Sequence, residues 1–397
     1  MTRVSAPRWA ATMADQLFPE FPWKRLAPLW EVARAHPGGP IDLSIGAPVD
    51  PTPPVVWEAL ICAVDAPGYP STEGPPALRE AVVDYLARKG GVRCLDADMV
   101  LPTIGSKEAI GQLPAFLGLG SSDVVAIPDV GYPTYEIGAL SVQAEIRRYL
   151  DPMDVDTDNV ALMWINSPSN PEGRILDIAE LRTLVSRARA SGTLLVSDEC
   201  YLDFGWDRPV TSVMHPDVCG DDPAGLLITS SLSKRSNLAG YRAGFLAGDP
   251  SLISSLLEYR KHMGQMVPSP VQAAMTAALV DDEHVSEQRQ RYLRRRRMLK
   301  PALQTAGFSV DQSEGGLYFW VRRDGEDCWA LANWFARLGI ICVPGEVYGD
   351  SGRQHVRLSI TATDGDVREV ASRLSRSGTD APASREPYGT SSHRTSR

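Results

Sequence analysis

The sequence predicts an α/β protein with a mostly parallel central sheet covered by helices, followed by a small α+β domain. The first observation is a series of near-continuous apolar runs, each ending at a polar or aromatic residue; they cover residues 124–127, 161–165, 193–196 and 226–228. The second is that helical patterns, such as residues 178–190, separate these runs. Apolar strands that alternate with helices are typical of a parallel sheet buried on both faces. Ligands bind such sheets outside the carboxyl ends of the strands.

The length of 397 residues and the hydrophobic content of 43% fit a globular protein of two domains. We predict a large domain over residues 39–280 that holds the ligand site, and a small C-terminal domain over residues 281–374. Residues 1–38 are interpreted as an N-terminal arm and helix that belong with the small domain. Residues 375–397 are rich in Ser, Arg, Thr and Pro, so we predict a disordered tail.

The charge balance and the cysteines narrow the class of protein. Lys and Arg number 40 and Asp and Glu 49, a net charge of −9, which argues against nucleic acid or an anionic membrane surface as a partner. The basic stretch at residues 289–297 is typical of a solvated helix face or of salt bridges between domains. We expect neither a membrane span nor a signal peptide. The six cysteines form no C-x-x-C pair and no cluster with histidine, so we expect a reducing cytoplasm and no metal site.

The first half of the chain offers three ligand-contact candidates. Residues 41–50 read as a strand that breaks at Gly46, where the backbone can approach a ligand closely or simply turn. Tyr69 lies in a Gly- and Pro-rich loop before a helix over residues 77–89. A strand then runs into a helix that starts at residues 105–107.

The helix start at Gly105, Ser106 and Lys107 has free N–H groups and is therefore a candidate anion site. An equally compatible interpretation makes Ser106 a helix N-cap with Glu108 in the first turn.

Lys234 is hard to explain as a surface charge, because it follows the apolar run at 226–228 among small residues. Ser231 and Ser233 supply hydroxyl groups nearby, and Arg242 adds a permanent cation. An amine and a cation that converge on one ligand suit a Schiff base to an aldehyde that also carries a phosphate, and pyridoxal 5′-phosphate (PLP) is such an aldehyde. A chance Ser-x-x-Lys string with packed hydroxyls is the alternative.

The last third of the chain reads as one long helix followed by the small domain. The helical pattern covers residues 270–298. Strands and one helix follow, at residues 308–310, 315–321, 329–338 (the helix), 340–345 and 355–360.

PLP sets requirements that other residues can meet. A carboxylate must face the pyridine nitrogen, donors must meet the phenolate oxygen, and an aromatic ring should stack on the cofactor. Asp198 is a carboxylate at a strand end, Asn170 and Tyr201 are donors in matching positions, and Tyr132 or Tyr135 offers the ring.

Taken together, these motifs resemble the class I and II aminotransferases, which are PLP enzymes of fold type I. The resemblance covers roughly residues 38–372. Its motifs, in order, are Gly46, Tyr69, Gly105-Ser-Lys, Tyr132-Pro-x-Tyr, Asn170-Pro-x-Gly, Asp198-x-x-Tyr, Ser231-x-Ser-Lys, Arg242 and Arg357-x-Ser. It implies a homodimer, with Tyr69 reaching the phosphate in the neighbouring subunit.

The resemblance also implies a role for each matching residue. Lys234 forms the Schiff base and then moves a proton between the substrate Cα and the cofactor, Asp198 pairs with the pyridinium nitrogen, and Arg357 binds the substrate α-carboxylate. The remaining cofactor contacts are Tyr132 on the ring, and Asn170 and Tyr201 at the ring oxygen. Ser106, Lys107 (mainly through backbone N–H groups), Ser231 and Arg242 are expected at the phosphate, and Ser233 is a further cofactor-binding candidate. Gly46 and Asn170 are also expected beside the substrate.

One position departs from the family pattern. The common tetrad Asn-Pro-Thr-Gly here has Glu172 in place of threonine. We expect Glu172 to point away from the cofactor and the turn to survive, with a cis peptide bond at Asn170–Pro171.

Within the family, the chain looks most like the actinobacterial N-succinyldiaminopimelate aminotransferases (succinyldiaminopimelate transaminases) of lysine and diaminopimelate biosynthesis. The segments that carry this likeness are 21–23, 41–51, 66–70, 166–171, 197–202, 238–245 and 266–275. The likeness implies glutamate as amino donor and N-succinyl-2-amino-6-oxopimelate as acceptor. The extra carboxylates of that substrate need further cations, for which Lys24, Arg25, Arg260 and Lys261 are candidates, although each is more typical of the surface.

Three alternatives stay open. An aminotransferase for another amino acid and a PLP carbon–sulfur β-lyase both suit the same cofactor-holding residues. A regulatory module that keeps the fold without catalysis is disfavoured by the intact Lys234, Asp198 and Arg357.

Overall fold

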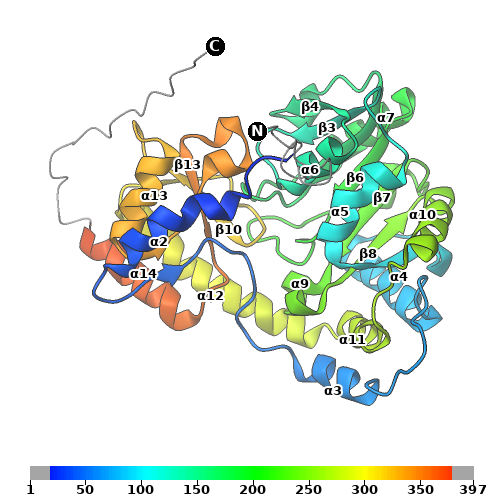
Figure 1. The fold of residues 1–397 in the computed structure, drawn as a ribbon, viewed down its shortest axis with the longest axis horizontal. Coiled ribbons are helices and arrows are strands. Elements are labelled where there is room, and N and C mark those ends of the chain that lie inside the picture. The colour runs from blue at the N-terminus through cyan, green and yellow to red at the C-terminus, as the bar shows by residue number, and fades with distance from the viewer. Residues whose placement is uncertain (1–17, 378–397) are drawn as a thin grey trace, which may run out of the picture.

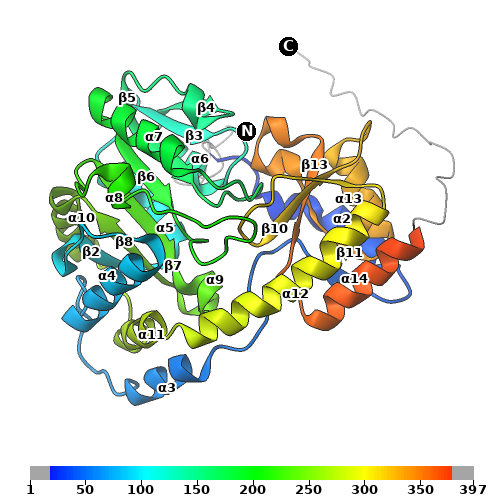
Figure 2. The same cartoon turned by 180° about the vertical axis from the view of Figure 1, so that it is seen from behind.

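The computed structural model describes residues 18–377 of the chain. It has two lobes (Figure 1). The larger lobe contains the central sheet, and the smaller one combines the C-terminal elements with the N-terminal helix α2 (Ala27–Arg34). The long helix α12 (Glu283–Thr305) runs from the larger lobe into the smaller one, as both views show (Figures 1 and 2).

The central sheet has seven strands in the order β2-β8-β7-β6-β5-β3-β4. Strand β8 is antiparallel to both of its neighbours, and the other pairs are parallel, so the predicted mostly parallel sheet is confirmed. The strands are β2 (Val100–Ile104), β3 (Val124–Pro128), β4 (Glu145–Tyr149), β5 (Val160–Asn166), β6 (Leu194–Asp198), β7 (Leu226–Ser231) and β8 (Ala243–Gly248).

Helices cover both faces of this sheet, which explains its continuous apolar runs. In β5, Leu162 and Trp164 join one apolar core, whereas Met163 and Ile165 join the core on the opposite face. The helices of this lobe are α3 (Pro54–Cys62), α4 (Pro76–Gly90), α5 (Gly105–Phe116), α6 (Thr134–Ser141), α7 (Ile178–Ser191), α8 (Pro216–Cys219), α9 (Leu232–Arg235), α10 (Pro250–Met263) and α11 (Ser269–Val280).

The smaller lobe is built on an antiparallel sheet of the order β12-β13-β10-β9. Helix α2 packs against α13, and β1 pairs in parallel with β11, so the N-terminal segment is part of this lobe. The predicted limits of the two domains, 39–280 and 281–374, stay a proposal. The elements are β1 (Ile41–Asp42), β9 (Ser309–Asp311), β10 (Tyr318–Arg322), α13 (Cys328–Arg337), β11 (Ile340–Ile341), β12 (Val343–Pro344), β13 (His355–Ser359) and α14 (Asp364–Ser377).

Short 3₁₀ helices connect these elements. They are η1 (Pro22–Leu26), η2 (Ala97–Met99), η3 (Pro152–Asp154), η4 (Ala239–Tyr241), η5 (Gly345–Tyr348) and η6 (Asp350–Gly352). None of the helices within residues 18–377 is long and apolar enough to cross a membrane.

The single helix predicted over residues 270–298 is wrong, because the structure has two helices there. Asp281 adopts an extended conformation after α11, and its carboxylate accepts a hydrogen bond from the Glu283 N–H at 2.9 Å. The same carboxylate binds Nδ1 of His284 at 2.7 Å. Aspartate side chains that bind nearby backbone N–H groups favour a new helix start over continuation of the old helix.

Two further predicted boundaries are corrected. The strand expected over residues 41–50 covers only Ile41–Asp42, because the Asp42 carboxylate accepts hydrogen bonds from the N–H and hydroxyl of Ser44 and turns the chain. The disordered tail was predicted from residue 375, but α14 continues to Ser377. Residues 378–397 of that tail, and residues 1–17 of the arm, lie outside the described part of the chain.

Candidate active site

The predicted site residues gather at one edge of the central sheet. Asp198 ends β6, Asn170 follows β5, and Lys234 lies in α9 directly after β7. Ser106 lies in the first turn of α5, directly after β2. The carboxyl ends of parallel strands meet at the same edge of a sheet, so residues far apart in sequence lie together here.

Asp198 is a buried carboxylate without a cationic partner. It is 5% exposed and accepts hydrogen bonds from the Tyr135 hydroxyl at 2.8 Å and the Cys200 N–H at 3.2 Å. Burial raises its pKa, although both of these neighbours lower it. No described residue forms an ion pair with Asp198, so the group calls for a cation from a ligand.

The Lys234 ammonium is close to the segment after β1. Its Nζ donates to the carbonyl oxygen of Gly46. Gly46 lies flat against Tyr318, because a Cβ added at this glycine would come within 2.6 Å of two ring atoms of Tyr318. The backbone at Gly46 is therefore closely approached by a side chain, and its predicted approach to a ligand stays a prediction.

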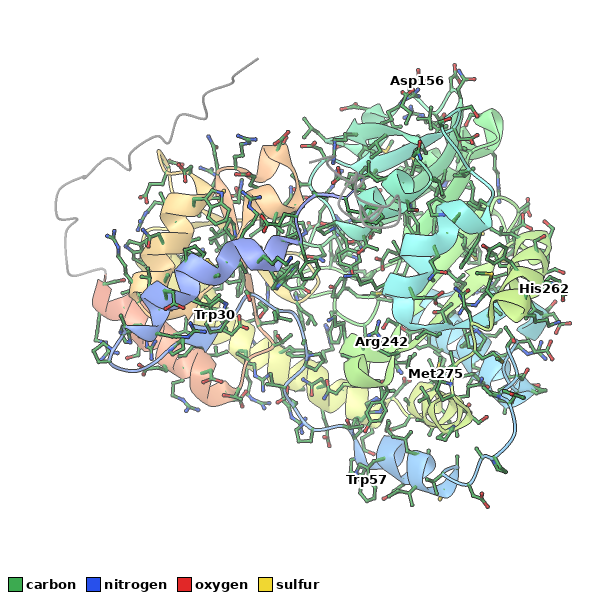
Figure 3. All side chains as sticks on the ribbon, viewed as in Figure 1. Trp30, Trp57, Asp156, Arg242, His262 and Met275 are labelled. Atoms are coloured by element: carbon green, nitrogen blue, oxygen red, sulfur yellow. The ribbon has the colours of Figure 1, made fainter. Side chains whose placement is uncertain are left out.

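The start of α5 forms a tight cradle with the start of β8. A Cβ added at Gly244 would lie 2.8 Å from the backbone carbon of Gly105 and 2.9 Å from the nitrogen of Ser106. The Arg242 guanidinium lies over Gly105, with its Cζ 3.0 Å from an added Cβ there. Figure 3 shows Arg242 beside α9. Free helix N–H groups beside an arginine make a site for a phosphate.

The two serines at helix starts, Ser106 and Ser231, have different roles. Ser106 does not cap α5, whose N-cap position is Ile104, and its hydroxyl instead accepts a hydrogen bond from the thiol of Cys200 at 3.4 Å. Ser231 does cap α9: its hydroxyl accepts from the Ser233 N–H at 3.0 Å and lies 2.7 Å from the Ser233 hydroxyl.

The two candidate aromatic rings have separate places. Tyr135 is 1% exposed and stacks on Trp164 in the core, with ring centroids 5.0 Å apart. Tyr132 is half-buried and meets Tyr135 edge to face at 5.7 Å. Tyr135 is thus engaged by Trp164 and by its hydrogen bond to Asp198, which leaves Tyr132 as the candidate ring for a cofactor.

The Arg357 guanidinium is buried and is held in place by hydrogen bonds. It is 3% exposed on β13, and its two terminal nitrogens donate to Asn170 Oδ1 at 2.8 Å and to the Ser44 carbonyl at 2.5 Å. Its buried Nε has no hydrogen-bond partner among the described residues. An unsatisfied buried donor is costly, so this arginine fits a ligand acceptor. The hydrogen bond from Arg357 also occupies Oδ1 of Asn170, so the Asn170 amide NH₂ is left to donate.

Three contacts could not be predicted from the motifs. Tyr201 is 5% exposed, and its hydroxyl lies 3.1 Å from the hydroxyl of Tyr318. The Asn166 amide donates to the Asp198 carbonyl, and Asn166 Oδ1 accepts from the Asn170 N–H. Tyr318 lies in an ordinary apolar strand, and the sequence around it gives no signal of a site.

Two predicted residues keep their side chains out of the site of their own chain. Tyr69 is 98% exposed. Lys107 is exposed and its Nζ lies 5.9 Å from the ring of Phe21, so only its backbone faces the cradle. Among the cations considered for distal carboxylates, Arg260 is not a surface group: it is fully buried and forms a two-pronged pair with Glu108 at 2.8 and 3.2 Å.

The Asn170–Pro171 peptide bond is cis, as predicted. Behind this turn is a cavity of about 510 Å³ between the lobes, which borders Asn166 and Asn170 but not Lys234. Glu172 lines the cavity, and no described residue gives its carboxyl group a hydrogen bond or ion pair. Burial raises the pKa of Glu172 to about 7, against a lowering effect of Arg174.

Comparisons with known proteins show the family of this chain. The model of the family "Aminotransferase class I and II" matches residues 39–374. The 4-dedimethylamino-4-oxo-anhydrotetracycline transaminase OxyQ of Streptomyces rimosus is 52% identical over 90% of this chain and 99% of its own length. An LL-diaminopimelate aminotransferase of Dehalococcoides mccartyi is 31% identical over 84% of this chain and 90% of its own. An aminotransferase structure from Neisseria meningitidis superimposes with a TM-score of 0.82 at 29% identity, covering 92% of this chain and 98% of that one.

Proposed function

Because this chain belongs to the class I and II aminotransferases, which depend on PLP, we propose that it transfers the amino group of glutamate to N-succinyl-2-amino-6-oxopimelate. The same reaction runs in reverse with N-succinyl-LL-2,6-diaminopimelate and 2-oxoglutarate. The observation that carries the proposal is the buried Arg357, whose guanidinium is fixed by Asn170 and Ser44 and keeps an unused donor. Such a group suits the α-carboxylate that both substrates share.

The residues present fit PLP. Asp198 lacks a cation, which a protonated pyridine nitrogen would provide. Side chains at Gly105 and Gly244 would collide with Arg242 and with the start of α5, whose N–H groups and arginine suit an anion. PLP supplies an electron sink that makes the substrate Cα–H acidic. We propose that Arg242 and the first N–H groups of α5 bind its phosphate, together with the hydroxyls of Ser106, Ser231 and Ser233.

The chain's own groups then have distinct tasks. Lys234 Nζ would bind the aldehyde carbon of PLP and, once released by the substrate amine, would act as the general base that takes the proton from the substrate Cα. Asn170 and Tyr201 donate to the ring oxygen, and Tyr132 stacks on the ring. Gly46 forms the wall beside the substrate, where its carbonyl accepts from Lys234.

We also propose a homodimer that works in the cytoplasm. The 98% exposure of Tyr69 supports a role for this side chain in the site of a second subunit. Helix α3 lies at the outer edge of the molecule, where Figure 3 shows Trp57. Trp57, Ile61 and Val64 are 44%, 61% and 75% exposed there, which suits a subunit interface. All six cysteines are free of disulfides, in keeping with a reducing compartment.

The diaminopimelate substrate is supported by likeness to the LL-diaminopimelate aminotransferase. The likeness to OxyQ favours a second candidate. Its identity to this chain is greater than that of the LL-diaminopimelate aminotransferase, which supports transfer of the amino group to the ketone of a ring compound. The same cofactor-holding residues also suit a carbon–sulfur β-lyase, and release of pyruvate, ammonia and homocysteine from cystathionine without a 2-oxo acid would identify it.

The test is a half-reaction assay. The PLP form of the protein is mixed with N-succinyl-LL-2,6-diaminopimelate, glutamate and other amino acids, and loss of the visible PLP absorption is followed. We expect rapid loss with the first two. No loss with N-succinyl-LL-2,6-diaminopimelate but rapid loss with another amino donor would reject the substrate and keep the aminotransferase. The Lys234→Ala variant should still bind PLP but show almost no turnover, and full turnover would remove Lys234 from the mechanism.

A further inference from the structure

Tyr318 lies between the residue proposed to bind the substrate carboxylate and the residues proposed to bind the cofactor. It is 4% exposed on β10, and β10 pairs with β13, the strand that carries Arg357. Its side chain meets Gly46 on one side and Tyr201 on another. Tyr318 also contacts Arg357, the group proposed to bind the carboxylate, as well as Tyr201, the group proposed for the cofactor ring oxygen.

The ring of Tyr318 contacts the Arg357 guanidinium. The Cζ of Arg357 lies 3.9 Å from the ring centroid, which is close for a cation over an aromatic face. The second aromatic ring at this guanidinium, Tyr348, is further away at 4.9 Å. Together with the hydrogen bonds to Asn170 and Ser44, the Tyr318 ring leaves the guanidinium little freedom to rotate.

The hydroxyl of Tyr318 contacts the Tyr201 hydroxyl, and the two phenols differ in acidity. Burial acts to raise the pKa of Tyr318, but the cations of Arg357 and Lys234 lower it overall. Burial drives the pKa of Tyr201 well above its usual range. The more acidic phenol is the better donor, and Tyr201 has only one proton to give. If Tyr201 donates to the cofactor ring oxygen, the hydrogen bond between the phenols must come from Tyr318.

We propose that Tyr318 is a positioning residue with two separable parts: its hydroxyl donates to Tyr201 and so directs the Tyr201 proton at the cofactor, and its ring fixes Arg357 for the substrate carboxylate. The hydrogen bond donated by Tyr318 also strengthens the hydrogen bond that Tyr201 donates to the cofactor, because hydrogen bonds in a chain polarise one another. This inference rests on the proposed roles of Tyr201 and Arg357.

Two substitutions separate the two parts. Tyr318→Phe removes the hydroxyl and keeps the ring over Arg357, whereas Tyr318→Leu removes both. Tyr348→Phe is the matched control, because Tyr348 borders the same guanidinium but its buried hydroxyl has no hydrogen-bond partner among the described residues.

Three quantities are measured on the full-length protein: the Kd of PLP for the apoprotein, the pH at which the visible absorption of bound PLP changes, and KM for glutamate. Tyr318→Phe should weaken PLP binding by about three- to tenfold and move the absorption change to higher pH, with KM nearly unchanged. Tyr318→Leu should in addition raise KM by roughly tenfold. Tyr348→Phe should leave all three quantities as in the wild type.

The outcomes are decisive in each direction. Equal behaviour of Tyr318→Phe and Tyr348→Phe overturns the hydroxyl role, and equal KM for Tyr318→Phe and Tyr318→Leu overturns the ring role. If the wild type itself converts no amino acid in the half-reaction, the proposed function fails, and the PLP affinities and absorption titrations still decide the role of the hydroxyl.

Discussion

Replacement of Glu172 by glutamine should stabilise the protein at alkaline pH and not at acidic pH. Glu172 faces the cavity behind the Asn170 turn, and burial raises its pKa from the usual 4.5 to about 7. A carboxyl group with a raised pKa in the folded state binds its proton more tightly when folded. The stability that this tighter proton binding gives the folded state is therefore complete below pH 4.5, and it is lost as the pH rises through 7.

The size of the effect follows from the same values. At 1.36 kcal/mol per pH unit, the rise from 4.5 to about 7 corresponds to roughly 3 kcal/mol as an upper limit. Glutamine has almost the same shape and no charge, so Glu172→Gln should remove this cost. Relative to the wild type, the variant should gain about 2–3 kcal/mol at pH 8 and much less at pH 5.

The assay is chemical denaturation of both proteins at pH 5 and pH 8, with PLP and protein concentration fixed because ligand and subunit association shift apparent stability. Glu199, whose pKa burial also raises to about 7, is present in both proteins and cancels in the comparison. Glu145→Gln on the exposed side of β4 is the control and should show no such pH dependence. A stability gain that is the same at both pH values would refute the reasoning.

Two other substitutions test single contacts. Arg357→Lys should raise KM for both glutamate and the 2-oxo acid by roughly 10- to 100-fold with a smaller effect on kcat, because lysine cannot form the two-pronged pair; unchanged KM values for both substrates would count against the assigned role. Glu108→Gln should lower the free energy of unfolding by about 3–5 kcal/mol, because it leaves the fully buried Arg260 without its charge partner. In the exposed pair of Arg291 and Glu287, Glu287→Gln should change it by less than about 1 kcal/mol, and equal losses in the two pairs would contradict the argument.

Much of the fold follows from local sequence pattern. The apolar runs and their polar ends located the parallel strands, and those ends brought Lys234, Asp198 and Asn170 to one edge of the sheet. This worked because strand burial and strand ends are encoded within a few residues. The break between α11 and α12 was missed, because both helices show an apolar helical period and only a short polar stretch, starting at Asp281, separates them.

Contacts between distant segments could not be predicted in the same way. The bond from Tyr135 to Asp198 joins residues 63 positions apart, and Tyr201 and Tyr318 are 117 apart. Arg260 looked like a surface cation because its burial depends on Glu108, which is 152 residues away. Such pairs are set by the packing of whole elements, and a single sequence does not record which side chains will face each other.

The anchoring of Arg357 has a consequence for how the lobes work together. Its strand belongs to the smaller lobe, whereas Lys234 and Asn170 belong to the larger one. Under the proposed function, a substrate bound at its carboxylate by Arg357 and at its reacting carbon by Lys234 would contact both lobes. Any tilt of the smaller lobe would then change the distance between these two binding groups.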